Sequence, residues 1–412
     1  MEGASTRFPK GSSPEFTRKA CQRWWVSKCP LKADYWRKVL KEEGFPEIFQ
    51  TWLMRDIEEG VDLGYKGAPK SYRTRPRIRT AEEKKQLAEQ YQTECELGRI
   101  VRAGKYPPFG KLFPDFFVSP TYTIPKKRKI GQPQKWRLIH NLSGHRWGRS
   151  WSVNAGIAKH EYSVTYPSIG TACHRIFCEA PRGCVVWGRD LKAYYRQLMI
   201  NPFYWWSMGT EFEKTYYFDC YCPFGARSMP AIFQRLSDAI RVIMVRRTPV
   251  NALLVMLDDF LGITYREEGE SDEALVERGE RAADAFDEEL LRLGISKQAA
   301  KDSPSAWKIT WLGIEIDTIR QTLSIPEDKI TNTVMYFNQE IFSSEHRYKR
   351  EISTSTLEEL IGVLCHYSQT WSLGKTLLWP LYLALSEYRE QWMENLTYWK
   401  QRWNLVRIAR TR

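Results

Sequence analysis

The stretch Val255-Met256-Leu257-Asp258-Asp259-Phe260-Leu261-Gly262 places two adjacent carboxylates between two apolar runs. Leu253 and Leu254 lengthen the run before the acids, and Ile263 lengthens the run after them. Short apolar runs of this kind predict two buried strands joined by a tight turn. Aspartates at the tip of such a hairpin are costly to desolvate, and they repel each other unless a cation neutralises them. A water-exposed Asp-Asp turn is the alternative interpretation.

A third aspartate, Asp190, ends another apolar run, Cys184-Val185-Val186-Trp187. If the two strands are neighbours in one sheet, Asp190, Asp258 and Asp259 converge on one edge of that sheet. Carboxylate oxygens are ligands that Mg²⁺ prefers, and three carboxylates suit a pair of ions bridged by phosphate oxygens. The sequence therefore predicts a site for two Mg²⁺ ions, with Mn²⁺ as an alternative.

The composition indicates a globular protein with a polyanionic partner. The 412-residue chain is 42% hydrophobic, which excludes a disordered protein and allows two or three domains. Lys and Arg number 62 against 49 Asp and Glu, and the net charge is +13. Since phosphates bind Lys and Arg while bases stack on aromatic rings, we expect a nucleic-acid partner. A basic protein without such a partner is the alternative.

Nine cysteines, an odd number, are scattered without the spacing of a disulfide framework. We therefore expect reduced thiols in an intracellular compartment, the nucleus or the cytoplasm. The groups Cys173-His174-Cys178-Cys184 and Cys220-Cys222 suggest zinc, but neither repeats a zinc-knuckle spacing. No apolar run approaches membrane-spanning length, and residues 1–19 lack the apolar core of a signal peptide, so no membrane association is expected.

Helical patterns surround a predicted basic hairpin. Residues 21–64 have helical periodicity, and Thr80 is the predicted N-cap of a helix that runs to Ile100 with Leu87, Tyr91 and Leu97 on one side. A strand, the basic turn Lys126–Lys129 and a second strand to Ile139 follow. Cations at a hairpin tip are well placed to hold a triphosphate, although a merely charged hairpin end is the alternative.

The later elements support the aspartate sheet. A helix near Pro230 has a buried stripe, a second helix ends at Gly294, and a second hairpin spans 307–325. The remainder is predicted to be helical, with a capping box over Ser355–Glu358. The stripe consists of Phe233, Leu236, Ile240, Ile243 and Met244.

From about Leu97 to Leu383 the ordered motifs resemble the reverse transcriptase domain of retroelements, specifically that of DIRS-type (tyrosine-recombinase) retrotransposons. Each motif alone is weak, and the ordered series carries the resemblance. The motifs are Val118-Ser119-Pro120, Ile124-Pro125-Lys126-Lys127, Trp136-Arg137-Leu138-Ile139, Ser152-Val153-Asn154, Arg189-Asp190-Leu191-Lys192, Pro223-Phe224-Gly225, Leu257-Asp258-Asp259-Phe260-Leu261 and Trp311-Leu312-Gly313-Ile314-Glu315.

The resemblance implies an α+β right-hand polymerase with fingers, an antiparallel palm sheet and a helical thumb. A helical and basic N-terminal extension would span 1–79, fingers and palm 80–325, and the thumb or connection 326–412. The implied activity is that of an RNA-directed DNA polymerase, a nucleotidyltransferase. Its implied partners are RNA and DNA template-primers and dNTPs, and protein partners are unspecified.

The resemblance also implies residue roles. Asp190, Asp258 and Asp259 would be catalytic metal ligands, and Lys301 would protonate the departing pyrophosphate. Tyr195 would be the steric gate against a ribose 2′-hydroxyl. The other implied nucleotide-binding residues are Lys127, Arg137, Phe224 and Gly225, and the hairpin that holds the primer end would include Trp311, Leu312 and Gly313.

Two positions depart from the family pattern. Met256 stands where most reverse transcriptases place Tyr, and with Leu257 this is similar to the Leu-Asp-Asp form of DIRS relatives. Ala193 and Tyr194 replace a usual Asp-Ala pair, which removes an accessory carboxylate and is expected to crowd the nucleotide pocket. Neither change removes a metal ligand.

Two further alternatives concern activity and length. A catalytically silent nucleic-acid-binding relic is one alternative to the polymerase, and an RNA-templated RNA polymerase, which the bulky Tyr195 disfavours, is another. The chain stops at Arg412, before the ribonuclease H domain or the recombinase of full-length relatives. We expect either a fragment of a longer element or a stand-alone polymerase.

Overall fold

The computed structural model describes residues 30–74, 80–106, 115–125, 136–144, 151–342, 353–371, 373–387 and 390. Helices account for 49% of these described residues and strands for 22%, in agreement with the predicted α+β class. The chain divides into two compact units. One unit combines the residues up to Pro167 with Trp187–Thr264 and Gly269–Ser305, and the other combines Ser168–Val186, Tyr265–Glu268 and the residues from Ala306 onward.

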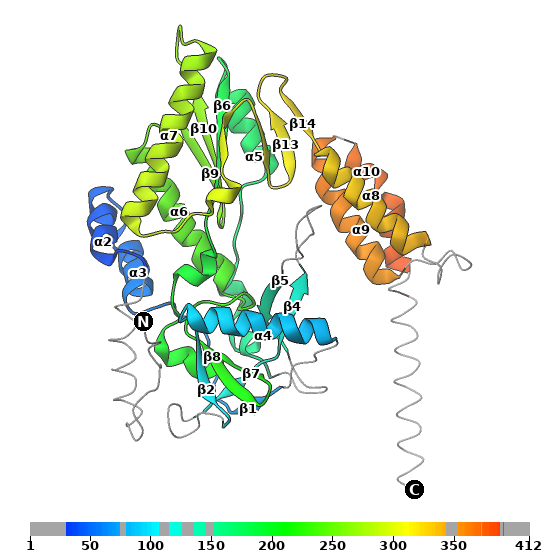
Figure 1. Ribbon diagram of the computed structural model, residues 1–412. Helices are drawn as coiled ribbons and strands as arrows, with labels where there is room; N and C mark the ends of the chain where they lie inside the picture. Colours follow the sequence, from blue (N-terminus) through cyan, green and yellow to red (C-terminus); the bar gives the residue numbers. More distant parts are fainter. Residues whose placement is uncertain are drawn as a thin grey trace. The chain divides into compact units, whose positions relative to one another are not determined.

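A four-stranded sheet of order β11-β6-β10-β9 carries the predicted carboxylates. Its strands β6, β9 and β10 are labelled in Figure 1. In the antiparallel β9–β10 hairpin Asp259 pairs with Met256, so that Leu257 and Asp258 form a two-residue turn. Since β6 lies beside β10, the prediction that these strands are neighbours is confirmed. The strands are β6 (Cys184–Asp190), β9 (Ala252–Met256), β10 (Asp259–Tyr265) and β11 (Ser303–Ala306).

Two long helices support this sheet. Helix α6 (Met229–Arg247) packs against β9, and all five residues of its predicted stripe are buried. Helix α7 (Asp272–Leu293) ends at Gly294 as predicted, and its Phe286 contacts Trp187 and Phe260 of the sheet. The periodicity of the sequence therefore located both helices.

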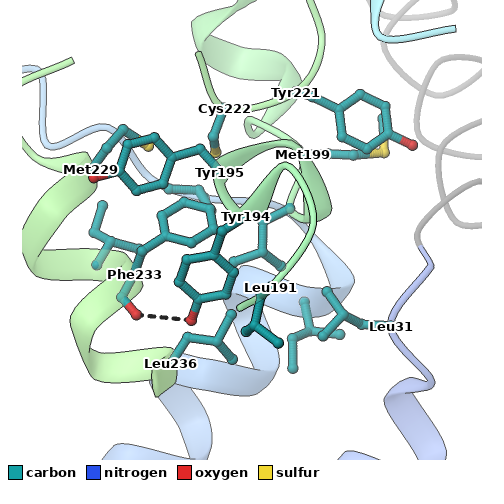
Figure 2. Packing of buried hydrophobic residues seen from close by; sticks show 14 of the residues in the cluster. Leu31, Leu191, Tyr194, Tyr195, Met199, Tyr221, Cys222, Met229, Phe233 and Leu236 are labelled. Carbon is teal, nitrogen blue, oxygen red and sulfur yellow. Dashed lines mark hydrogen bonds between the residues drawn. The ribbon is translucent and has the colours of Figure 1, made fainter. Parts of the chain in front are cut away.

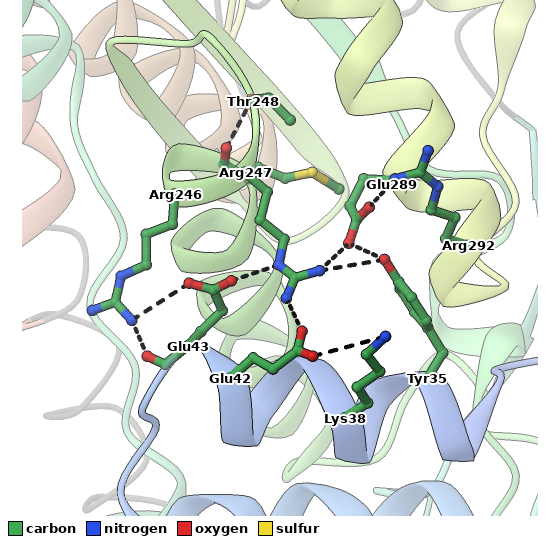
Figure 3. Close-up of polar contacts among 10 residues, drawn as sticks. Tyr35, Lys38, Glu42, Glu43, Arg246, Arg247, Thr248, Glu289 and Arg292 are labelled. Carbon is green, nitrogen blue, oxygen red and sulfur yellow. Dashed lines mark hydrogen bonds and ion pairs between the residues drawn. The ribbon is translucent and has the colours of Figure 1, made fainter.

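The N-terminal helices α2 (Ala33–Glu42) and α3 (Glu47–Glu58) share the core of the first unit. The indole Nε1 of Trp36, a fully buried side chain, donates to the Leu293 carbonyl at 3.0 Å. The Arg247 guanidinium at the end of α6 pairs with Glu42 and Glu43, both at 2.5 Å (Figure 3). Residues far apart in the sequence thus fix this helix pair to α6 and α7.

A five-stranded sheet of order β1-β3-β7-β8-β2 belongs to the same unit. Helix α4 (Ala81–Glu96) begins as predicted, because the Thr80 hydroxyl accepts from the Glu83 amide at 3.0 Å. Leu87 and Tyr91 are buried, but the prediction that the helix runs to Ile100 is wrong: it ends at Glu96, and Leu97 beyond it is 56% exposed. The strands are β1 (Tyr72–Arg73), β2 (Ile100–Gly104), β3 (Phe117–Val118), β7 (Gly209–Phe212) and β8 (Thr215–Asp219).

The predicted basic hairpin is present as β4 (Thr121–Pro125) and β5 (Trp136–His140), which pair antiparallel. Its tip, including Lys127, lies outside the described residues. The first unit also contains several 3₁₀ turns, at Val153–Gly156, Lys159–Tyr162, Tyr194–Gln197, Pro202–Ser207 and Ala299–Lys301.

In the second unit, Leu312 (φ 46°) and Gly313 (φ 83°) join the first two strands of a three-stranded sheet. Positive φ at both turn residues is the pattern of a type I′ hairpin, which matches strand twist. The strands are β12 (Lys308–Trp311), β13 (Ile314–Asp317) and β14 (Thr322–Ser324).

Helices make up the rest of the second unit. Helix α9 contacts both α8 and α10 (Figure 1). The α9 N-cap is Ser353, whose hydroxyl accepts from the Thr356 amide at 3.1 Å, so the predicted cap at Ser355 is wrong: Ser355 already lies in the first turn. No described helix is both long and apolar enough to cross a membrane. The helices are α5 (Ile169–Cys173), a π-turn at His174–Cys178, α8 (Glu327–Phe342), α9 (Thr354–Tyr367), a 3₁₀ turn at Ser368–Thr370 and α10 (Gly374–Leu377).

Candidate active site

Two of the predicted carboxylates meet where β6 ends beside the β9–β10 turn. The Leu191 amide donates to the Asp258 carbonyl at 3.0 Å, which joins the residue after Asp190 to the turn. The Lys301 Nζ donates to Asp190 Oδ2 at 2.6 Å. Asp190, Asp258 and Lys301, predicted as catalytic from three distant segments, therefore lie together in one unit.

The electrostatics of Asp258 reflect this crowding. Burial raises the pKa of the Asp258 carboxyl above its ordinary value, and the neighbouring Asp190 raises it further. The cations Lys301 and Arg137 oppose that rise without cancelling it. A cation placed between the two carboxylates would relieve both the desolvation and the repulsion.

Asp259 is the first residue of β10 and is half-buried. Across the described part of the chain, no three His, Cys, Asp or Glu side chains group closely enough to hold a metal ion. Metal ligation by all three aspartates therefore stays a prediction. Of the three predicted ligands, the structure shows Asp190 and Asp258 close to each other.

Three predicted nucleotide-binding side chains stack on one another. The Tyr195 and Phe224 ring centroids are 4.9 Å apart, and the Arg137 guanidinium carbon lies 5.1 Å from the Phe224 centroid. Tyr195 also packs against Phe233 at 4.8 Å (Figure 2). Burial raises the pKa of the Tyr195 phenol, so the hydroxyl stays protonated at neutral pH. The stack joins β5, the 3₁₀ turn after Ala193 and the loop before α6.

Gly225 is required by the close approach of its loop to β5. Its φ is +130°, and a Cβ placed there would lie 2.0 Å from the His140 carbonyl oxygen. Asn154, which is buried, donates from Nδ2 to the Gly225 carbonyl at 2.8 Å and accepts from the Arg227 amide at 2.8 Å. The sequence motif contained Asn154, but its role as a clamp on this loop was not predicted.

A buried ionic network lies next to the stack and was not predicted either. Arg196 donates to Asp219 Oδ1 at 2.5 Å, and His140 Nδ1 lies 3.0 Å from Asp219 Oδ2. Although burial alone would raise the pKa of Asp219, Arg196 and His140 hold it below its ordinary value. The network links β5, β8 and the turn that carries Tyr195.

Tyr194 does not crowd the nucleotide-binding residues, and that prediction is wrong. Its hydroxyl donates to the Phe233 carbonyl at 3.1 Å (Figure 2). The same hydroxyl lies 2.7 Å from Ser237 Oγ, and the side chain is buried against α6. Ala193 has a left-handed backbone, φ 46°, immediately before it. The phenol is directed into the core because α6 supplies partners for its hydroxyl.

The residues predicted to hold the primer end, Trp311 to Gly313, belong to the second unit. The Trp311 side chain is buried, whereas Leu312 and Gly313 are partly exposed at the turn. At this turn the indole is therefore covered, and Leu312 and Gly313 are the residues open to the surroundings. Its role as a primer grip stays a prediction.

The sequence matches no protein-family model and none of the curated proteins with which it was compared. Its structure is similar to that of a foamy viral protease-reverse transcriptase in complex with RNA/DNA hybrid, with TM-score 0.54 and 15% identity over 86% of this chain and 42% of that one. Its dRH form with double-stranded DNA gives TM-score 0.52 and 13% identity over 86% and 55%. A further complex with double-stranded DNA gives TM-score 0.50 and 15% identity over 86% and 66%.

The chain thus spans between 42% and 66% of the length of these three viral chains. The fold is reverse-transcriptase-like, and the predicted resemblance is confirmed at that level. With sequence identities of 13% to 15%, the similarity to these viral chains establishes the fold and not the activity.

Proposed function

We propose that this chain is an RNA-directed DNA polymerase that extends a primer on an RNA or DNA template with dNTPs. The observation that carries the proposal is the proximity of Asp190, Asp258 and Lys301 at one edge of a sheet in a reverse-transcriptase-like fold. The ordered motifs support assignment to the DIRS-type group. The β11-β6-β10-β9 sheet would be the palm, the β4–β5 hairpin part of the fingers, and α8 to α10 the thumb.

Asp190 and Asp258, with Asp259 next in the chain, would hold Mg²⁺, because carboxylates that repel each other in a half-buried site suit a hard divalent cation. Bound there, Mg²⁺ would lower the pKa of the primer 3′-hydroxyl and neutralise charge on the leaving pyrophosphate. This chemistry asks little covalent work of the protein, so positioning and charge provide nearly all the acceleration.

The side chains around the carboxylates have complementary roles. Arg137, whose guanidinium carbon lies 5.1 Å from the Phe224 ring centroid, would pair with the triphosphate through its two-pronged guanidinium. Tyr195, packed against both Phe224 and Phe233, would exclude a ribose 2′-hydroxyl. Lys301, 60% exposed, is free to exchange Asp190 for a phosphate and to give its proton to the departing pyrophosphate.

Primer extension on primed poly(rA) with dTTP and Mg²⁺ tests the proposal. Asp258→Asn should lower the rate of extension by roughly a thousandfold. It removes a carboxylate that would help to hold Mg²⁺, and with it about 4 kcal/mol of transition-state stabilisation. Asp284→Asn, an exposed aspartate on α7, is the matched control and should extend like the parent. Binding of a fluorescent RNA/DNA duplex should be unchanged in both variants. Extension that survives Asp258→Asn would overturn the metal assignment.

A catalytically silent nucleic-acid-binding protein is the second candidate. It is favoured by the lack of a three-carboxylate group among the residues that the structure describes. A parent protein that binds the duplex and never extends the primer would favour it over the polymerase.

A further inference from the structure

Side chains of helix α6 bind both the backbone amide and the backbone carbonyl of Leu257, the turn residue before Asp258. The Leu257 amide donates to Gln234 Oε1 at 2.9 Å, and the Leu257 carbonyl accepts from Ser237 Oγ at 2.6 Å. Leu257 has a left-handed backbone, φ 57°, which a branched side chain rarely adopts. Strained conformations of this kind persist only when their surroundings hold them.

The Ser237 hydroxyl has a choice of acceptors. Its Oγ lies 2.9 Å from the Phe233 carbonyl, one helical turn back, as well as 2.6 Å from the Leu257 carbonyl. A helical serine commonly donates to its own preceding turn, and one hydroxyl proton serves one acceptor at a time. The groups around the hydroxyl therefore decide whether that proton is directed toward the turn.

Tyr194 supplies this direction. Its hydroxyl lies 2.7 Å from Ser237 Oγ and 3.1 Å from the Phe233 carbonyl (Figure 2). When the phenol donates to Ser237 Oγ, the serine proton is left for a carbonyl, and the Leu257 carbonyl at 2.6 Å is nearer than the Phe233 carbonyl at 2.9 Å. Tyr194 and Ser237 are both buried, so water does not compete.

We propose that Tyr194 and Ser237 are positioning residues that fix the Leu257 turn and so keep Asp258 beside Asp190. The part that concerns catalysis rests on the proposed polymerase function, and the part that concerns the turn does not.

Tyr194→Phe and Ser237→Ala, singly and together, test the proposal. Tyr91→Phe is the matched control, because its equally buried hydroxyl binds Thr121 at 3.0 Å, outside this set of contacts. Hydrogen exchange of the amides of 256–260, measured on the protein without metal or nucleotide, should quicken about tenfold in both test variants. In the control it should stay within about twofold of the parent. The double variant should match Ser237→Ala, because Tyr194 acts through the serine.

In primer extension, both test variants should lower kcat about tenfold while KM for dTTP stays within about twofold. Unchanged exchange in the turn, or equal quickening in Tyr91→Phe, would overturn the turn clamp. Quickened exchange with an unchanged kcat would overturn the catalytic positioning. If the parent extends no primer, the polymerase proposal fails, and the exchange measurement still decides the clamp.

Discussion

Gly225→Ala is the substitution whose cost the structure defines best. At φ +130° the added Cβ would lie 2.0 Å from the His140 carbonyl oxygen, whereas real Cβ contacts essentially never fall below 3.0 Å. The loop and β5 must therefore separate by 3.0 − 2.0 Å, about 1 Å. Backbone strain contributes about 1 to 3 kcal/mol, and two weakened hydrogen bonds contribute about 1 kcal/mol each. We expect a loss of about 4 kcal/mol in the free energy of unfolding.

The two bonds are the His140 amide to the Phe224 carbonyl, at 3.3 Å, and Asn154 to the Gly225 carbonyl, at 2.8 Å. Because both hold the stack that would bind nucleotide, KM for dTTP should also rise at least about tenfold. Gly269→Ala is the control: its φ is +74° and no atom lies within 4 Å of the added Cβ. That variant should lose only about 1 kcal/mol, from backbone strain. Urea unfolding of both variants measures the difference, and equal losses would refute the reasoning.

Three further substitutions test a buried ion pair, a buried carboxyl group and the proposed steric gate. Asp219→Asn should lower the free energy of unfolding by about 3 kcal/mol at pH 7, because it leaves the buried Arg196 without its ion-pair partner Asp219. Since the folded-state pKa of Asp219 is lowered, the stability difference between parent and variant, measured by urea unfolding, should shrink as the pH falls below about 4. Asp56→Asn should stabilise the protein by roughly 2 kcal/mol at pH 7. Burial raises the pKa of Asp56 to about 6, so the parent loses stability as the pH rises from about 4 to 6 and the variant does not. Equal dependence of unfolding free energy on pH in parent and variant would contradict this. Tyr195→Ala should raise the incorporation of ribonucleotides relative to dNTPs by about a hundredfold, and an unchanged ratio in single-nucleotide extension would remove the gate.

Much of the fold was predictable because its signals are local. The alternation of apolar runs and turn residues located the β9–β10 hairpin, and helical periodicity located α6 with its buried stripe. The approach of Asp190 to this hairpin was a conditional prediction that needed β6 to be a neighbour of β10, and the sheet order provides it.

The contacts that escaped prediction join residues that are distant in the sequence. The direction of Tyr194 depends on Ser237, 43 residues later, and a sequence pattern does not show which side of a turn offers acceptors. His140 and Asp219 are 79 residues apart, and Asn154 reaches a carbonyl 71 residues away. The Ser353 cap was missed for a local reason, since several serines and threonines cluster there and backbone geometry selects among them.

Incorporation of dTMP on primed poly(rA) by the parent protein, followed as Mg²⁺ is titrated and then removed with a chelator, tests the central claim most directly. The adjacent carboxylates of Asp190 and Asp258 predict extension that needs the ion, stops on chelation and resumes when Mg²⁺ is restored. A folded protein that binds the duplex yet adds no nucleotide at any concentration of Mg²⁺ or Mn²⁺ would contradict it.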